Sequence, residues 1–266
     1  MDDQAAVAYL RHRRATHFFG DAGPSLPAGV TARWRLTPRD PRGWHANMVG
    51  FIDGPAAHLQ TVLDIACAWF EEHGVDCWVD LDERGILFRH QDLLAARGFT
   101  LRDDWDAMIC RQLVALPPPP CVTVVPVSDD AGLALAAWLS EQNDASRPLV
   151  PADIVVQRRL RRYQREQADW NTRFVVAYLD GEPAGTARIT DEQLPVIVGV
   201  ATLPAARGRG VATAITAVLA ERALASHAAC ALYVERGSQA QRIYRRLGFQ
   251  SLFRCRTWSR PRRVTG

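Results

Sequence analysis

The fold of this chain is decided by one stretch, which reads Val196-Ile197-Val198-Gly199-Val200-Ala201-Thr202-Leu203-Pro204-Ala205-Ala206-Arg207-Gly208-Arg209-Gly210-Val211-Ala212-Thr213. Residues 196–202 form a short apolar run typical of a buried strand, and Pro204, which has no N–H, ends its ladder. From Gly210 apolar residues recur every three or four positions, as on one side of a helix. The turn therefore aims unpaired backbone N–H groups and the positive end of a helix dipole at one point. Such a point attracts a phosphate.

The composition of the turn supports this prediction. Glycine is needed at Gly208 and Gly210 because the backbone must approach a pyrophosphate closely or adopt a positive φ. Backbone amides are then the ligands, and arginine guanidinium groups add charge-assisted hydrogen bonds. A Walker A loop is excluded because Gly-Lys-Ser/Thr is missing, and a dinucleotide fingerprint needs glycine at Thr213. An ordinary glycine-rich turn is the structural alternative. The predicted phosphate-binding residues are Arg207, Gly208, Arg209, Gly210, Val211, Ala212 and Thr213.

Length and composition favour two domains, and the chain is expected to be cytoplasmic. The chain has 266 residues and 48% hydrophobic content, which suffices for two cores. It contains no apolar run long enough to span a membrane, and its first residues lack the features of a secretion signal. Its six cysteines form no CxxC pair, so we expect free buried thiols and no metal site.

Charge is distributed unevenly along the chain. The net charge of +3 is too small to indicate a nucleic-acid partner. Before Cys121 there are 12 arginines and 16 acidic residues, whereas from Cys121 onward there are 20 arginines and 13 acidic residues. The chain has no lysine. An arginine-rich second half suits a phosphate-bearing ligand, although the arginines within 158–165 are typical of a solvated helix face.

A proline run marks the predicted domain boundary. Residues 116–120 read Leu-Pro-Pro-Pro-Pro, which favours an extended linker. We therefore predict a first domain at 1–116, a linker at 117–121 and a second domain at 122–266. Periodicity predicts helices at 2–18, 55–73, 92–97, 129–142, 151–168, 210–222 and 239–247. It predicts strands at 30–36, 48–53, 77–81, 105–113, 122–127, 174–178, 184–189, 196–202, 230–234 and 252–258.

Two motifs in the second half resemble those of the GNAT superfamily of acyl-CoA-dependent acyltransferases. One is the turn Arg207-Gly208-Arg209-Gly210-Val211-Ala212 after Pro204. The other is Gly237-Ser238-Gln239-Ala240-Gln241-Arg242-Ile243-Tyr244-Arg245-Arg246-Leu247-Gly248-Phe249, with Gly237 where the family often has asparagine. The resemblance spans roughly 121–260. It implies an α/β (α+β) fold with a mixed, mostly antiparallel sheet flanked by helices, and acetyl-CoA or another acyl-CoA as cofactor.

The first half shows a fainter echo of the same family. Val79-Asp80, the segment 93–99 and a strand ending near Leu113 resemble the closing part of a GNAT domain. The glycine-rich turn is missing ahead of them. We therefore predict two GNAT-like domains in tandem, the first degenerate and without cofactor. An unrelated α/β accessory domain is the alternative.

The resemblance also implies roles for individual residues. In the family, the strand before the turn splays from its neighbour and faces the thioester, which implicates Val200, Ala201 and Thr202. Tyr244 matches the position whose phenol protonates the departing CoA thiolate, although a core aromatic is the alternative. Ser238 is expected to orient the pantetheine or a water. Candidate general bases are Glu192, Asp191 and Glu235 near strand ends, or a water chain.

The predicted function is acyl-CoA-dependent N-acyl transfer, with acetyl as the first candidate group, to an amine of a small molecule. In the family, the region corresponding to residues 143–148 contacts the acceptor. One alternative is a GNAT-like transferase whose donor is a carrier-protein thioester or an aminoacyl-tRNA. Another is a non-catalytic module that binds acyl-CoA or a partner.

Overall fold

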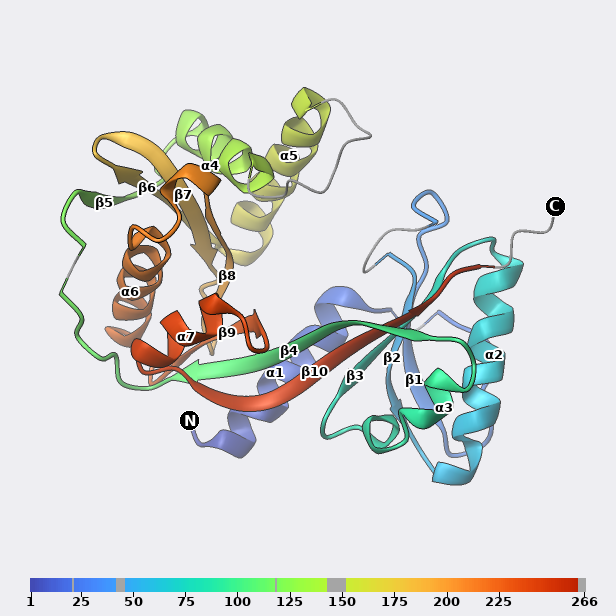
Figure 1. Cartoon of the computed structure of the whole chain (residues 1–266). Coiled ribbons are helices and arrows are strands. Elements are labelled where there is room, and N and C mark those ends of the chain that lie inside the picture. Colours follow the sequence, from blue (N-terminus) through green and yellow to red (C-terminus); the bar gives the residue numbers. More distant parts are fainter. Residues whose placement is uncertain (21, 42–45, 118, 143–151, 263–266) are drawn as a thin grey trace. The chain divides into compact units, whose positions relative to one another are not determined.

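The structure, a computed structural model, describes residues 1–20, 22–41, 46–117, 119–142 and 152–262. The chain forms two compact units (Figure 1). One comprises Met108–Ser251 together with Met1, and we call it the 108–251 unit. The other comprises Asp2–Ala107 and Leu252–Gly266, and we call it the 2–107 unit. Both have a mostly antiparallel sheet flanked by helices, which confirms the predicted fold class.

The 108–251 unit is built on the strand order β5-β6-β7-β8-β9. Neighbouring strands are antiparallel except for β8 and β9, which are parallel. Its strands are β5 (Val122–Pro126), β6 (Arg173–Leu179), β7 (Glu182–Ile189), β8 (Val196–Thr202) and β9 (Cys230–Glu235). Its helices are α4 (Asp130–Gln142), α5 (Ala152–Trp170), the short 3-10 helix η3 (Pro204–Ala206), α6 (Val211–Leu224) and α7 (Gln239–Arg246).

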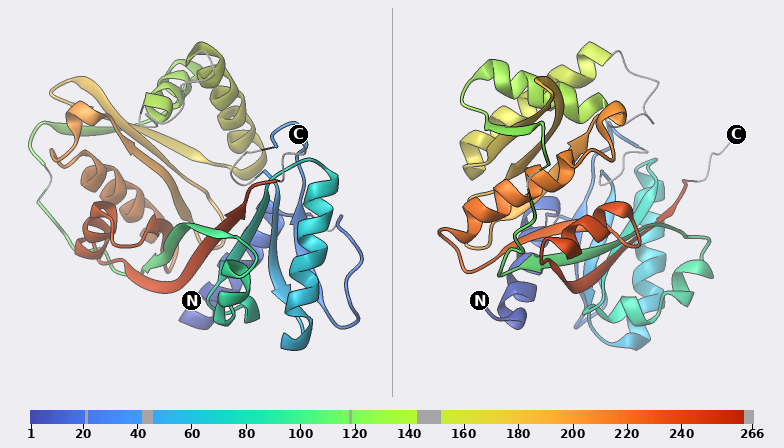
Figure 2. Two further views of the ribbon diagram at one scale, coloured as in Figure 1. Left: turned by 45° about the vertical axis from the view of Figure 1, so that its right-hand side comes forward. Right: turned by 60° about the vertical axis from the view of Figure 1, so that its left-hand side comes forward.

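Helices cover both faces of this sheet. In β6, Val175 and Ala177 pack in the core that includes α6, whereas Phe174 and Val176 pack against α4 and α5. Because successive side chains of a strand point to opposite faces, α6 lies on one face and the α4–α5 pair on the other (Figure 2). The two helix layers therefore approach β7 and β8 from opposite sides.

The 2–107 unit is completed by a strand from the far end of the sequence. Its strand order is β1-β2-β3-β10-β4. The antiparallel register of β10 on β3 runs from Cys255 opposite Asp82 to Arg260 opposite Cys77. Its strands are β1 (Thr31–Arg35), β2 (Met48–Asp53), β3 (Cys77–Asp82), β4 (Thr100–Cys110) and β10 (Gln250–Arg260). Its helices are α1 (Asp3–Phe18), η1 (Ala56–His58), α2 (Leu59–Glu72), η2 (Ile86–Arg89) and α3 (Asp92–Ala95).

The two compact units meet within two strands of the chain, β4 and β10. The division falls within β4 and within β10, so the whole of the strand expected at 252–258 belongs to the 2–107 unit. Periodicity identifies such a strand, but it carries no information on which sheet edge the strand will join. The division at 117–121 stays a prediction about domains.

Most expected elements are present, with small shifts at their ends. The strand expected at 105–113 is observed as β4 at 100–110, because its first half carries exposed or half-exposed polar residues that hide the apolar pattern. The residues 143–148, expected to approach the acceptor, lie outside the described residues. Five cysteines are buried free thiols as expected, whereas Cys121 is exposed.

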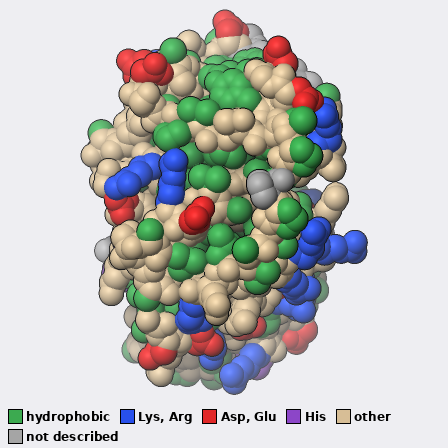
Figure 3. Space-filling view, turned by 90° about the vertical axis from the view of Figure 1, so that its left-hand side faces the viewer, with side chains coloured by type: hydrophobic (Ala, Val, Ile, Leu, Met, Phe, Trp, Pro, Cys, Tyr) green, Lys and Arg blue, Asp and Glu red, His purple; other side chains and the backbone are tan. Residues whose placement is uncertain are grey.

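The surface carries charges of both signs. On the face drawn in Figure 3, arginine and acidic side chains are interspersed with apolar ones. Within the described ranges, no helix is both long and apolar enough to cross a bilayer. The same residues contain no group of His, Cys, Asp and Glu arranged to hold a metal ion.

Candidate functional site

Strands β8 and β9 diverge after a short parallel contact. Their register pairs Val196 with Ala231 and Ile197 with Leu232, and it extends no further in this fully described stretch. The rest of β8 stays hydrogen-bonded to β7 on its other edge. The edge of β8 from Val198 to Thr202 therefore lines a wedge that opens between the two strands. An extended ligand can pair with such a strand edge.

A β-bulge lies in β8 at this wedge. Thr186 pairs with Ala201 and Arg188 with Val198, so Gly199 and Val200 together oppose the single residue between them on β7. Gly199 has φ +65°, a conformation in which glycine is favoured, and it is exposed. A bulge leaves its extra residue out of the ladder, so backbone polar groups here are available to a ligand.

The predicted anion-binding turn follows β8. Gly208 and Gly210 have φ +77° and +85°, which explains why both are glycine. A Cβ on Gly208 would meet nothing within 4 Å, so its backbone faces open space, whereas a Cβ on Gly210 would lie 2.5 Å from Pro119 Cγ. The N–H of Ala214 donates to Gly210 O at 2.9 Å. The amides of residues 211–213 form the first turn of α6, where helices have no intrahelical acceptors.

The two arginines of the turn differ in their surroundings. Arg209 pairs with Asp180 at 2.7 Å, and both side chains are about half exposed. The hydrogen bond from Arg209 lowers the pKa of the Asp180 carboxyl. Arg207 is exposed, and its Nε lies 3.4 Å from Thr202 O. The turn thus combines positive φ glycines, helix N-terminal amides and two surface guanidinium groups at the end of β8.

Tyr244 lies in the core beside the start of α6. It is 5% exposed, and burial raises its pKa to about 12, while its hydrogen bond with the Thr216 side chain acts in the opposite direction. The Thr216 hydroxyl donates to Ala212 O at 2.8 Å. The structure therefore links the phenol of Tyr244 to the first turn of α6, next to the glycine-rich turn. It also packs Tyr244 near Phe249, with ring centroids 6.0 Å apart.

The other predicted site residues are not gathered at one point. Ser238 is the N-cap of α7: it accepts from Gln241 N at 3.2 Å and donates to Glu235 O at 2.7 Å. Glu235 is exposed at the end of β9, and the parallel register puts it at the same end as Thr202. Glu192 lies before the first residue of β8, at the other end of this strand from Thr202. A strand of seven residues is about 20 Å long. Thr202 itself has a buried hydroxyl that finds no hydrogen-bond partner among the described residues.

The sequence did not predict an ion pair that lies against the bulge of β8. Arg188 Nε lies 2.6 Å from Glu166 Oε2, with side chains 8% and 5% exposed. Glu166 also accepts from Arg162 Nε at 2.7 Å. The Arg188 guanidinium lies 5.1 Å from the ring centroid of Tyr163, whose hydroxyl is 2.7 Å from Ser140 Oγ. Gly199 inside a strand was the one available signal, since an isolated glycine there indicates a bulge or a close contact.

A similar wedge in the 2–107 unit is closed by the chain itself. Strands β2 and β3 are parallel and pair from Met48–Trp78 to Gly50–Asp80. A register shift in β2 accompanies Phe51 at φ +53°, as the bulge of β8 accompanies Gly199. Phe19 covers this region: its ring is 5.5 Å from that of Phe51, and a Cβ on Gly50 would lie 2.8 Å from Phe19 Cζ.

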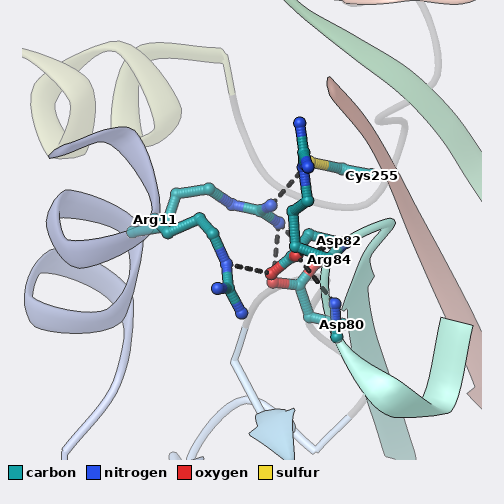
Figure 4. Close-up of polar contacts among 7 residues, drawn as sticks. Arg11, Asp80, Asp82, Arg84 and Cys255 are labelled. Carbon is teal, nitrogen blue, oxygen red and sulfur yellow. Dashed lines mark hydrogen bonds and ion pairs between the residues drawn. The ribbon is translucent and has the colours of Figure 1, made fainter. Parts of the chain in front are cut away.

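Helix α1 is held to the sheet beside this closed wedge by arginine–aspartate pairs whose carboxylates are buried (Figure 4). Arg14 donates to both carboxylate oxygens of Asp80, at 2.5 and 2.6 Å, and to Cys255 Sγ at 2.6 Å. Arg11 Nε donates to Asp82 Oδ2 at 3.0 Å. Burial nevertheless raises the pKa of Asp80, although the charge of Arg14 opposes the shift. Burial also raises the pKa of Cys255 to about 12.

The arrangement in the 108–251 unit has known counterparts. Residues 134–249 match the model of the acetyltransferase (GNAT) family. A GCN5-related N-acetyltransferase from Kribbella flavida is similar over 97% of this chain and 95% of its own, with TM-score 0.66 and 20% identity. One from Sphaerobacter thermophilus gives TM-score 0.69 and 18% identity, covering 89% of this chain and 78% of its own. A comparison with curated proteins gave no match.

The likeness extends to proteins with two such domains. A tandem GNAT protein from the clavulanic acid biosynthesis pathway covers 90% of this chain and 80% of its own, with TM-score 0.58 and 11% identity. At these identities the solved structures show the fold. The family match rests on residues 134–249, so this part of the chain is similar to a domain of the acetyltransferase (GNAT) family.

Proposed function

We propose that this protein is an N-acyltransferase that moves an acyl group, in the first instance acetyl, from CoA to an amine of a small molecule. One observation carries the proposal: the part of β8 that no longer pairs with β9 is followed along the chain by the turn with Gly208 and Gly210. A strand edge for the pantetheine arm and an anion-binding turn for the pyrophosphate thus come one after the other in the sequence. The buried free thiols also suit a cytoplasmic location.

In this proposal the backbone binds the donor. The edge of β8 from Val200 to Thr202 pairs with the pantetheine amides, and the amides of residues 208–213 hold the pyrophosphate. Arg207 remains near phosphate oxygens, and Arg209 exchanges Asp180 for phosphate at little cost, because an exposed ion pair contributes little.

The chemistry is a direct attack of the amine on the thioester carbonyl. Backbone N–H at the bulge stabilises the charge that develops on the carbonyl oxygen. The C–N bond forms, the C–S bond breaks, and Tyr244 gives its proton to the departing thiolate. The phenol is protonated at neutral pH, because the ordinary tyrosine pKa of 10.0 already lies above that pH and burial raises the pKa of Tyr244 further. The proton lost by the amine goes to a carboxylate, with Glu192 and Glu235 as candidates, or to water.

The 2–107 unit is proposed to bind no cofactor. Phe19 covers its β2–β3 wedge, and α1 is fixed beside it by Arg14 and Asp80. The turn after β2 contains Pro55, which has no N–H, and the Asp53 carboxylate, which accepts from Gly54 N at 2.9 Å. A carboxylate at this place repels phosphate and occupies an amide that would bind it.

Calorimetry with acetyl-CoA tests the first step, and mass spectrometry tests the second. One acetyl-CoA per chain is expected to bind, and a mixture of small amines is expected to yield a component heavier by one acetyl group. Absence of binding would refute the turn assignment. Binding without transfer would favour a sensor or interaction module. Reaction only with an acylated carrier protein or an aminoacyl-tRNA would replace the free CoA donor.

A further inference from the structure

Arg188 makes three contacts that join α5 to the bulge of β8. Its Nε is paired with Glu166, and its guanidinium lies over the ring of Tyr163. Its Nη1 lies 2.5 Å from the position that a Cβ on Gly199 would occupy. The guanidinium therefore rests directly against the glycine that forms the bulge.

This contact is rigid, because each partner of Arg188 is itself held. Glu166 is 4% exposed and receives a second hydrogen bond from Arg162. Tyr163 is 2% exposed, and its hydroxyl is bonded to Ser140 of α4. A flexible arginine would move aside for any neighbour, but one with a buried carboxylate partner cannot do so without leaving that charge unpaired.

The bulge determines where backbone groups of β8 point. Gly199 and Val200 oppose one residue of β7, and Gly199 has a positive φ. A change of a few tens of degrees at Gly199 would redirect the next N–H, that of Val200. In the proposed function this region faces the acyl carbonyl, where a donor must meet the developing charge in the correct direction.

We propose that Arg188, fixed by Glu166 and Tyr163, is a positioning residue that sets the Gly199 bulge and so directs the Val200 N–H toward the thioester carbonyl. The inference rests on the proposed function and adds to it a residue that does not touch the donor. Arg188 acts through the backbone, so its loss changes the chemical step more than the binding of CoA.

The test compares Arg188→Gln and Glu166→Gln with Asp80→Asn. Asp80 belongs to an equally buried arginine–carboxylate pair in the 2–107 unit, so the three variants are matched in burial. All three are expected to lower the melting temperature. Only the first two are expected to lower kcat, by about tenfold or more, with the KM for acetyl-CoA changed less than about threefold. A fall in melting temperature with unchanged kcat would overturn the proposal.

A spectroscopic readout tests the same inference without an acceptor. The carbonyl carbon of bound [1-13C]acetyl-CoA is expected to be deshielded in the native protein and in Asp80→Asn, and to return toward its free chemical shift in Arg188→Gln. An identical bound shift in Arg188→Gln would refute the positioning role. If acetyl-CoA does not bind the native protein, the proposed function itself is refuted. This outcome differs from one in which acetyl-CoA binds and the positioning role of Arg188 alone is refuted.

A double-mutant cycle tests the contact itself. Gly199→Ala introduces a Cβ that meets Arg188 Nη1, and it also strains the positive φ. In the Arg188→Gln background the steric part disappears, so Gly199→Ala is expected to reduce kcat by a smaller factor than in the native protein. Equal factors in both backgrounds would show that Arg188 does not set the bulge.

Discussion

The phenol of Tyr244 hydrogen-bonds the side chain of Thr216, one helix away. The Thr216 hydroxyl also donates to Ala212 O, so it lies between Tyr244 and the first turn of α6. Tyr244 is thereby connected to the helix that follows the turn proposed to bind CoA. Burial raises the pKa of Tyr244 to about 12, while the hydrogen bond with Thr216 lowers it.

Tyr244→Phe is therefore expected to reduce kcat by about 10² or more, because the thiolate must leave without a positioned acid. The affinity for acetyl-CoA, measured by calorimetry, should change little, since the ring stays in place. In the native protein, kcat/KM should show no loss from phenol ionisation up to about pH 10, because the pKa of Tyr244 is about 12. Unchanged kcat in the variant would make Tyr244 a packing residue.

The same residue predicts a dependence of stability on pH. The pKa of Tyr244 is raised from 10.0 to about 12, so the unfolded chain ionises first as pH rises. The stabilisation is complete below pH 10 and is lost at up to about 1.4 kcal/mol per pH unit between pH 10 and 12. Urea unfolding of the native protein and Tyr244→Phe at pH 9 and pH 11 isolates this contribution. Equal pH dependence in both proteins would contradict it.

Gly208→Ala is expected to weaken acetyl-CoA binding through the backbone alone. Gly208 and Gly98 share φ +77°, and a Cβ on either meets nothing within 4 Å. Both substitutions should therefore cost about 1–2 kcal/mol of stability. Only Gly208→Ala should raise the dissociation constant of acetyl-CoA, by about tenfold or more, because distorted amides no longer converge on phosphate. Calorimetry on both variants decides, and equal affinities would remove the turn from the site.

Arg14→Met is expected to destabilise the 2–107 unit by about 3–5 kcal/mol, because it leaves the buried Asp80 carboxylate unpaired. The pKa of Asp80 is already raised by burial, so protonation relieves the cost at low pH. The loss, measured by denaturant unfolding, should be larger at pH 8 than at pH 5. The double variant Arg14→Met/Asp80→Leu should recover most of the stability. A pH-independent loss would show that Asp80 is not the cause.

The fragment 1–116 should not fold by itself. It contains α1 and β1–β4 but lacks β10, the strand that pairs with β3 from Asp82 to Cys77. Its exposed β3 edge should lead to aggregation. Size-exclusion chromatography and circular dichroism check this, and adding a peptide of residues 250–262 should restore a soluble form. A monomeric, cooperatively unfolding 1–116 fragment would instead support the domain limits predicted from the proline run.

Local features of the site were predictable from the sequence because they are local. The bounds of β8 agree with its β-branched run, and the glycines of the turn have the positive φ that their pattern predicted. Gly199 also carried a signal of a bulge, which the apolar run around it concealed. In contrast, Arg188 and Glu166 are 22 residues apart in the sequence, and no periodicity relates them. Glu166 follows a group of arginines whose pattern is typical of a solvated helix face.

The pairing of strands that are far apart in the chain, such as β10 with β3, could not be predicted from the sequence either. The alternation in 252–258 predicts a strand equally well for either sheet, because the exposed edge of β3 is a property of the folded unit. Likewise Phe19 reads as an apolar residue after a helix, whereas the structure uses it to close the β2–β3 wedge. Such roles depend on contacts between distant segments, which a single sequence does not encode in its local patterns.

The position of β10 also has a consequence for how the protein is made. Domains generally fold in order as they leave the ribosome, the first to emerge being the first to fold. Here the strand beside β3 is translated after every helix of the 108–251 unit, so the earliest-made half must wait for Cys255 to Arg260. A nascent chain therefore holds an incomplete sheet in the 2–107 unit until β10 has been made. The earlier segment depends on the later one for its last central strand.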